Sequence, residues 1–202
     1  MTGWFSTTLT IRRIKLSPAD NGVLKSFQDS IRRARQNLDE IRLISYQVMI
    51  HRLRNILKVD LKEFFKGKKV LEVGCSTGFI VSRLREEFGA EAHGLDKNEK
   101  MIANENEPFL HPGEAAELPF SDGSFDIVLS KSLLDLLPPA ELKAFMQEAF
   151  RVLKPGGQMI HFFKADAYLF GLLYPLTRKA GFNEIDFDLS AHIFEKPADK
   201  AE

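Results

Sequence analysis

The chain has 202 residues, of which 44% are hydrophobic and 28% are charged, and its formal net charge is zero. These values are ordinary for a soluble globular protein with one α/β domain and a helical extension. The single cysteine, Cys75, excludes an intrachain disulfide and favours a reducing compartment, so we expect a cytoplasmic protein. No apolar run approaches the roughly 18 residues needed to cross a membrane.

Charge is distributed unevenly along the chain. Residues 1–66 contain 13 Lys/Arg and 6 Asp/Glu, whereas residues 67–202 contain 15 and 22. The basic part favours an anionic acceptor, an acidic partner or a membrane surface, or it lies against its own acidic domain. Residues 1–19 contain no acid, which is typical either of an organelle transit peptide or of an ordinary flexible N-terminus.

Two amphipathic helices are predicted in the basic part. The first begins at Ser17-Pro18 and its apolar residues continue to Ile41, and the second covers residues 45–57, with Val48, Met49, Leu53, Ile56 and Leu57 facing inward. We therefore expect a flexible N-terminus at 1–17, a helical extension at 18–66 and a domain at 67–197. The extension forms a lid over a ligand site, forms the seam of a homodimer, or packs on the domain's own sheet.

Strands and helices alternate after residue 66. Strands are predicted at 69–73, 92–96, 109–111, 126–130, 159–163, 184–189 and 191–195, and helices at 79–88, 99–103, from Pro139, and at 166–179 with a kink or split at Pro175. The pattern predicts a Rossmann-like α/β fold, a mainly parallel seven-stranded sheet with one antiparallel strand.

A glycine-rich turn follows the first strand. Residues 70–79, V-L-E-V-G-C-S-T-G-F, are typical of a buried strand that ends in such a turn and opens a helix, and this turn presents backbone N–H groups to a ligand. The next strand ends in Asp96, 22 residues after Gly74, as expected of an acid that binds a ribose. A dinucleotide fingerprint would need glycine in place of Ser76 and Phe79.

Four motifs in register resemble class I S-adenosylmethionine-dependent methyltransferases. Residues 72–79 resemble the first motif of the family, residues 113–120 and 122–130 its adenine-side loop and fourth strand, and residues 151–160 its turn into the fifth strand. The resemblance covers about residues 68–196. It is strongest to the broad methyltransferase type 11 group that includes ubiquinone and menaquinone methyltransferases.

The resemblance implies an S-adenosylmethionine site. The cofactor-binding residues that it implies are Glu72, Gly74, Cys75, Ser76, Gly78, Asp96, Lys97, Met101, Glu114, Ala115 and Ser130. Glu72 would orient the cofactor's amino group, Asp96 would accept both ribose hydroxyls, and Glu114 would accept from the adenine amino group. Ser76 replaces a usual glycine and fits if its φ is ordinary. Cys75 is expected to pack rather than to act as a nucleophile.

The acceptor side departs from the family pattern. Asp135 stands where many relatives carry the first of two histidines, and it is either a general base or a surface residue. Lys131, next to the cofactor, points to solvent, pairs with Asp135 or holds an anionic acceptor. The five histidines are scattered, so no metal site is predicted.

Methyl transfer to a small-molecule or lipid-like acceptor is therefore the expected function. The alternative is a non-catalytic, methyltransferase-like binding protein that acts through its basic N-terminal helices. Nucleic acid is not the expected substrate, because the chain lacks both an Asn/Asp-Pro-Pro-Tyr/Phe motif after the fourth strand and a basic patch interleaved with aromatic residues.

Overall fold

The structure is a computed structural model that describes residues 38–102, 107–162, 167–187 and 191–198. The predicted flexible N-terminus and most of the first predicted helix lie outside the described residues. The chain divides into two compact units after Ile44, and the sheet belongs to the second unit, residues 45–202. The boundary falls inside α2 (Leu38–Leu57), which is one continuous helix. The predicted break between Ile41 and Ser45 is therefore wrong.

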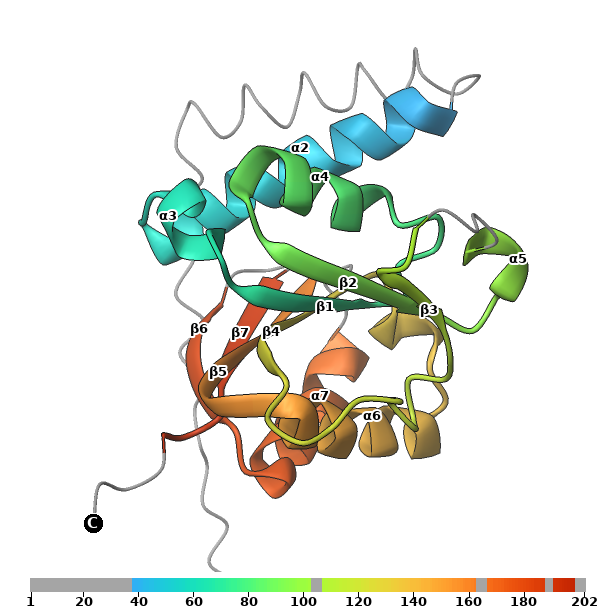
Figure 1. The fold of residues 1–202 in the computed structure, drawn as a ribbon. Helices are drawn as coiled ribbons and strands as arrows, with labels where there is room; N and C mark the ends of the chain where they lie inside the picture. The colour runs from blue at the N-terminus through green and yellow to red at the C-terminus, as the bar shows by residue number, and fades with distance from the viewer. Residues whose placement is uncertain (1–37, 103–106, 163–166, 188–190, 199–202) are drawn as a thin grey trace, which may run out of the picture. The chain divides into compact units, whose positions relative to one another are not determined.

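A seven-stranded sheet in the order β3-β2-β1-β4-β5-β7-β6 forms the centre of the second unit (Figure 1). Its strands are β1 (Lys69–Val73), β2 (Glu91–Asp96), β3 (Leu110–Pro112), β4 (Phe125–Lys131), β5 (Leu153–Phe162), β6 (Asn183–Phe187) and β7 (Ala191–Glu195). Among the described strands, β7 alone runs opposite to the other six. This strand order and these strand directions confirm the predicted fold class. Because the parallel strands are joined by helical crossovers, the carboxyl ends of β1, β2 and β4 lie on one edge of the sheet.

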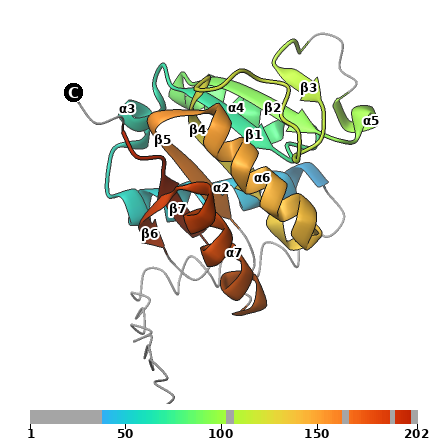
Figure 2. The same ribbon diagram turned by 90° about the horizontal axis from the view of Figure 1, so that it is seen from below.

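Helices cover both faces of the sheet. The helices that follow α2 are α3 (Leu61–Phe65), α4 (Phe79–Phe88), α5 (Glu99–Ile102), α6 (Pro139–Val152) and α7 (Ala167–Ala180), with a 3-10 turn, η1 (Leu134–Leu136). α6 and α7 lie on one face and α4 on the other (Figure 2). α7 contains Pro175 and is a single helix, so it is not split there. Among the described residues, no helix is both long and apolar enough to span a membrane.

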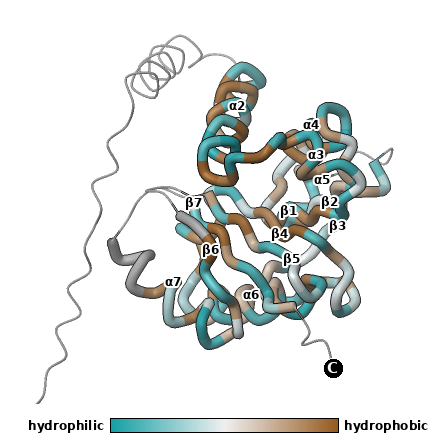
Figure 3. Tube along the Cα trace, turned by 90° about the vertical axis from the view of Figure 1, so that its left-hand side faces the viewer, coloured by the Kyte–Doolittle hydropathy of each residue, from teal (hydrophilic) through white to brown (hydrophobic). Residues whose placement is uncertain are grey.

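Two apolar clusters form the core, one on each face. The first joins Tyr46, Met49 and Leu53 of α2 to Val70 of β1 and Leu129 of β4. The second joins the opposite side of the same strands to α6 and α7. Hydrophobic residues accordingly gather along the central strands (Figure 3). The second half of α2 thus packs on the domain's own sheet, one of the three arrangements considered for it.

The inward face of α2 was predicted only in part. Met49 and Leu53 are buried as predicted, whereas Val48, Ile56 and Leu57 are half-buried. Tyr46 and Ile50 are buried but were not predicted to be, and the Tyr46 hydroxyl donates to Glu87 Oε2 at 2.9 Å. This tertiary hydrogen bond gives the tyrosine hydroxyl a partner, so the side chain can be buried without an unpaired polar group.

Two further elements differ from the sequence prediction. α3 was not predicted, although Asp60 caps it by accepting from the N–H groups of Lys62 at 2.7 Å and Glu63 at 3.2 Å. The cap is visible in the sequence as Asp60 with Glu63 three residues later. β5 begins at Leu153, directly after α6, rather than at residue 159, because Leu153 pairs with Phe125 across an irregularity that includes Gly156.

Candidate functional site

The turn after β1 is fastened to the end of β2. The N–H groups of Gly74 and Cys75 both donate to Leu95 O, at 2.7 and 3.1 Å, and the Ser76 N–H donates to Asp96 Oδ2 at 2.8 Å. Gly74, Ser76 and Gly78 have φ values of +79°, +52° and +74°. The condition stated for serine, an ordinary φ, is not met: the bond to Asp96 helps to hold Ser76 in the left-handed region, at a cost of about 1–2 kcal/mol.

Asp96 uses both carboxylate oxygens in this frame. Oδ1 accepts from the Asn98 N–H at 2.9 Å while Oδ2 holds Ser76. A carboxylate oxygen has two lone pairs, so each still offers one acceptor position to a ligand hydroxyl. Lys97 and Met101 follow in exposed positions. The structure therefore brings Asp96 to the turn and leaves Lys97 and Met101 at the surface beside it.

Close packing explains why small residues stand in and under the turn. A Cβ on Gly78 would lie 2.7 Å from Leu110 Cδ1, and one on Gly94 would lie 2.7 Å from Cys75 Sγ. Cys75 is buried, and burial raises the pKa of its thiol. Because a thiol with a raised pKa stays protonated, this environment suits packing and not nucleophilic chemistry.

Glu72 is a buried carboxyl group at the end of β1. Only 3% of the residue is exposed, and among the described residues its Oε2 has no hydrogen-bond partner. The pKa of Glu72 is raised to about 8: burial is the main cause, the charge of Lys131 opposes the shift, and the charge of Asp96 adds to it. A buried acceptor of this kind costs about 1–3 kcal/mol, and a cationic ligand group such as an ammonium would match it.

Ser130 lies at the end of β4 but is directed to a residue that the sequence did not single out. Its Oγ is 2.6 Å from Nδ1 of His161, its register neighbour on β5, and both residues are buried. Burial, with a smaller contribution from the neighbouring His192, lowers the pKa of His161 to about 3, so the imidazole is neutral. His161 lies in the apolar segment of β5, where the sequence gives no functional signal for it. Its contact with Ser130 is seen only in the structure.

Lys131 and Asp135 follow β4 but do not meet. Lys131 is half-buried, whereas Asp135 is exposed on η1, and no ion pair joins these two described residues. Between them Leu133 packs on the turn, since a Cβ on Gly74 would lie 3.2 Å from Leu133 Cδ1. The structure therefore places Lys131 at the sheet edge and Asp135 at the surface.

Glu114 and Ala115 lie on the loop between β3 and β4. Glu114 is exposed and forms an isolated β-bridge with Glu117, and Ala115 is buried in the core cluster under α6. The backbone N–H of Glu117 donates to Glu114 O at 3.2 Å. The loop thus has a defined shape at the two predicted adenine-side positions.

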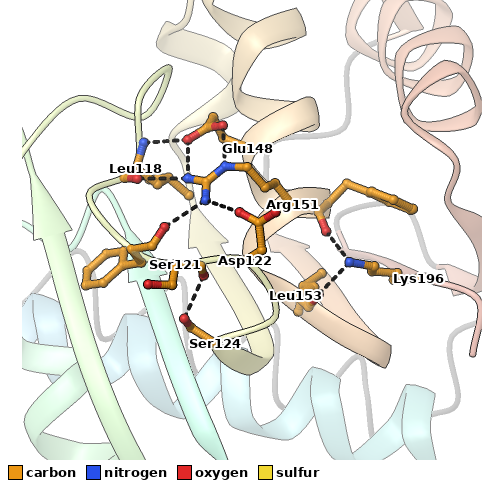
Figure 4. Close-up of polar contacts among 10 residues, drawn as sticks. Leu118, Ser121, Asp122, Ser124, Glu148, Arg151, Leu153 and Lys196 are labelled. Carbon is orange, nitrogen blue, oxygen red and sulfur yellow. Dashed lines mark hydrogen bonds and ion pairs between the residues drawn. The ribbon is translucent and has the colours of Figure 1, made fainter. Parts of the chain in front are cut away.

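Arg151 of α6 holds the following part of the same loop (Figure 4). Its guanidinium donates to the carbonyl oxygens of Leu118 and Phe120 at 2.9 and 2.7 Å, and to Asp122 Oδ1 at 2.8 Å. It also forms a bidentate pair with Glu148, whose Oε2 accepts from the Leu118 N–H at 2.8 Å. We call this network the Arg151 clamp. The sequence motif around Arg151 indicated a turn and not this role.

Comparison with known proteins agrees with this geometry. Residues 70–157 match the family described as a methyltransferase domain. A demethylmenaquinone methyltransferase from Listeria welshimeri is 36% identical over 128 residues, which are 58% of this chain and 52% of that protein. The chain spans about half the length of the curated relatives it matches.

Solved structures share the fold at low sequence identity. A protein from Pyrococcus horikoshii is 23% identical with a TM-score of 0.62, and the match covers 80% of this chain and 92% of that one. The [4+2]-cyclase SpnF is 22% identical with a TM-score of 0.57, and the match covers 68% of this chain and 59% of that one. Because a cyclase shares the fold, the fold alone does not define the reaction.

Proposed function

Because this chain carries a class I S-adenosylmethionine-dependent methyltransferase domain, we propose that it transfers a methyl group to a small-molecule or lipid-like acceptor. The observation that carries the proposal is the 2.8 Å hydrogen bond from the Ser76 N–H to Asp96. It joins the turn after β1 and the acid at the end of β2 into one frame at the carboxyl edge of the sheet, where open α/β sheets bind nucleosides.

The residues of this frame fit S-adenosylmethionine. Glu72 offers its unmatched buried oxygen to the cofactor's ammonium, Asp96 offers its free lone pairs to the ribose hydroxyls, and Glu114 with the Ala115 N–H faces the adenine. The bound cofactor supplies an already activated methyl group, so the protein's task is to align the acceptor and exclude water. Asp135 is the proposed general base, and its exposure leaves it accessible to an acceptor proton.

The acceptor class is proposed from the names of the relatives. The name of the Listeria relative makes quinone-like acceptors the first to screen. The alternative function is binding without methyl transfer, and the fold does not decide between the two, because a cyclase shares it. The predicted action through N-terminal helices, including a homodimer seam, falls mainly on residues outside the described part of the chain.

Calorimetric titration with S-adenosylmethionine and S-adenosylhomocysteine tests the proposal. We expect micromolar binding by the wild type and at least about 10-fold weaker binding by Asp96→Asn, because hydrogen bonds to charged groups contribute about 1.5–3 kcal/mol. Glu114→Ala should also weaken binding. Glu117→Ala is the matched control, since Glu117 is also exposed on the same loop and has no assigned role.

The outcomes separate the two functions. Binding together with transfer of a labelled methyl group to an acceptor supports the enzyme. Binding of both ligands with no transfer across quinone-like, small-molecule and lipid acceptors supports the binding protein. Failure of the wild type to bind either ligand refutes an S-adenosylmethionine site in this chain.

A further inference from the structure

Glu72 and Lys131 lie on neighbouring strands and on the same face of the sheet. Glu72 of β1 is in register with Leu129 of β4, so Lys131 stands two residues farther along β4. Alternate strand residues share a face, and Leu129 belongs to the core cluster on the α4 face. Both side chains therefore emerge on the α4 side of the sheet, at its carboxyl edge.

These opposite charges do not form an ion pair with each other. Glu72 Oε2 has no hydrogen-bond partner, and the side chain of Lys131 forms no salt bridge or hydrogen bond in the part of the chain that the structure describes. Each nevertheless feels the other's charge. Burial raises the pKa of Glu72 and lowers that of Lys131, so each charged form is destabilised where it stands.

The backbone holds Lys131 in this position. Lys131 is in register with Phe162 of β5, and the next residue, Ser132, has a φ of +54° and donates its N–H to Phe162 O at 2.7 Å. Leu133 then packs on Gly74. A residue in the left-handed region costs about 1–2 kcal/mol and persists only where its surroundings enforce it. Lys131 is thus fixed beside the turn.

We propose that Lys131 binds an anionic group of a ligand that lies between it and Glu72. The inference rests on the proposed function. The Lys131 ammonium by itself would repel the cofactor's sulfonium, whereas an anionic group between these two cations would attract both of them. Two ligands offer that chemistry: the α-carboxylate of the cofactor's amino-acid end, whose ammonium suits Glu72, and an ionised oxygen of the acceptor.

Calorimetry on the full chain with Lys131→Met tests the assignment and identifies the source of the anion. The first arm compares S-adenosylhomocysteine with 5′-methylthioadenosine, which lacks the amino-acid end. The second arm titrates 4-hydroxybenzoate and its neutral amide into protein saturated with S-adenosylhomocysteine. Lys131→Arg should restore binding because it keeps the charge, and Lys143→Met, which removes an exposed lysine of α6, is the matched control.

If Lys131 binds the cofactor's carboxylate, Lys131→Met should bind S-adenosylhomocysteine at least about 10-fold more weakly, and its affinity for 5′-methylthioadenosine should be unchanged. If Lys131 binds an ionised oxygen of the acceptor, Lys131→Met should bind S-adenosylhomocysteine as the wild type does. The wild type should then bind the benzoate more tightly than the amide, and the variant should lose this preference. If Lys131→Met changes neither, the inference is wrong although the proposed function stands. If the wild type does not bind S-adenosylhomocysteine, the proposed function fails and the inference fails with it.

Discussion

Replacement of Arg151 by methionine is the perturbation whose effect follows most directly from the structure. The substitution keeps much of the aliphatic stem and removes the guanidinium at the centre of the Arg151 clamp. Five hydrogen bonds of 2.7–2.9 Å are lost. Because two of them hold the carbonyl oxygens of Leu118 and Phe120, the loop that carries Glu114 keeps only the bond from the Leu118 N–H to Glu148 as its attachment within this network to α6.

The expected loss of stability is about 3 kcal/mol. A hydrogen bond to a charged group contributes about 1.5–3 kcal/mol, and such contributions are not additive within one network. The bond to Asp122 counts for little because that side chain is 81% exposed. Glu148 counts for more, since its side chain is only 19% exposed and would lose its cationic partner, keeping only the bond from the Leu118 N–H. For a domain of this size the loss corresponds to a melting temperature about 6–12 °C lower.

Urea denaturation of wild type and Arg151→Met measures this loss, and calorimetry with S-adenosylhomocysteine measures its effect on the loop. Arg42→Met is the control, because Arg42 pairs with Asp39 only at the surface and should cost no more than about 0.5 kcal/mol. A loss below about 1 kcal/mol for Arg151→Met would show that water replaces the clamp. Unchanged ligand affinity despite a 3 kcal/mol loss would refute its connection to the binding site.

Three further substitutions test the buried groups and the turn. Glu72→Gln should stabilise the ligand-free protein relative to the wild type, increasingly between pH 4.5 and 8. Because the folded pKa of Glu72 is about 8, the wild type loses up to about 1.4 kcal/mol of stability per pH unit as the pH rises through this window. Urea titrations at pH 4, 6 and 8 should show the difference between the two proteins growing. His161→Asn should have the opposite signature: its folded pKa of about 3 lies below the ordinary 6.5, so the wild type loses stability as pH falls from 6.5 and the variant should lose it less steeply. Gly78→Ala should cost about 2–4 kcal/mol and Gly89→Ala about 1, since both have positive φ but only at Gly78 would the new Cβ meet Leu110; equal losses in urea would contradict this packing argument.

Elements with strong local signals were predicted most accurately. β1 and α4 have the predicted bounds, because a short apolar run precedes the glycine turn and Gly89 ends the helix in the left-handed conformation. The start of β5 and the continuity of α2 were predicted wrongly. The first depends on pairing with Phe125, and the second on a helix whose buried face is set by packing, neither of which a local pattern reports.

The candidate site divides in the same way. The motif residues and the proximity of Asp96 to the turn follow from sequence spacing, because carboxyl ends of parallel strands meet at one edge. The left-handed φ of Ser76 does not follow, since it accompanies a hydrogen bond across 20 residues. The pairing of Ser130 with His161 spans 31 residues and was equally hidden.

The sequence by itself determined the order of strands and helices, the glycine turn and the family resemblance, because periodicity, caps and motifs are relations between near neighbours. Only the tertiary structure decided which charges are buried and which polar atoms are matched. The sequence around Glu72 and Lys131 does not show how far their charged groups are buried. The fold places them near each other without an ion pair, because desolvation and hydrogen bonding depend on residues brought together from distant segments.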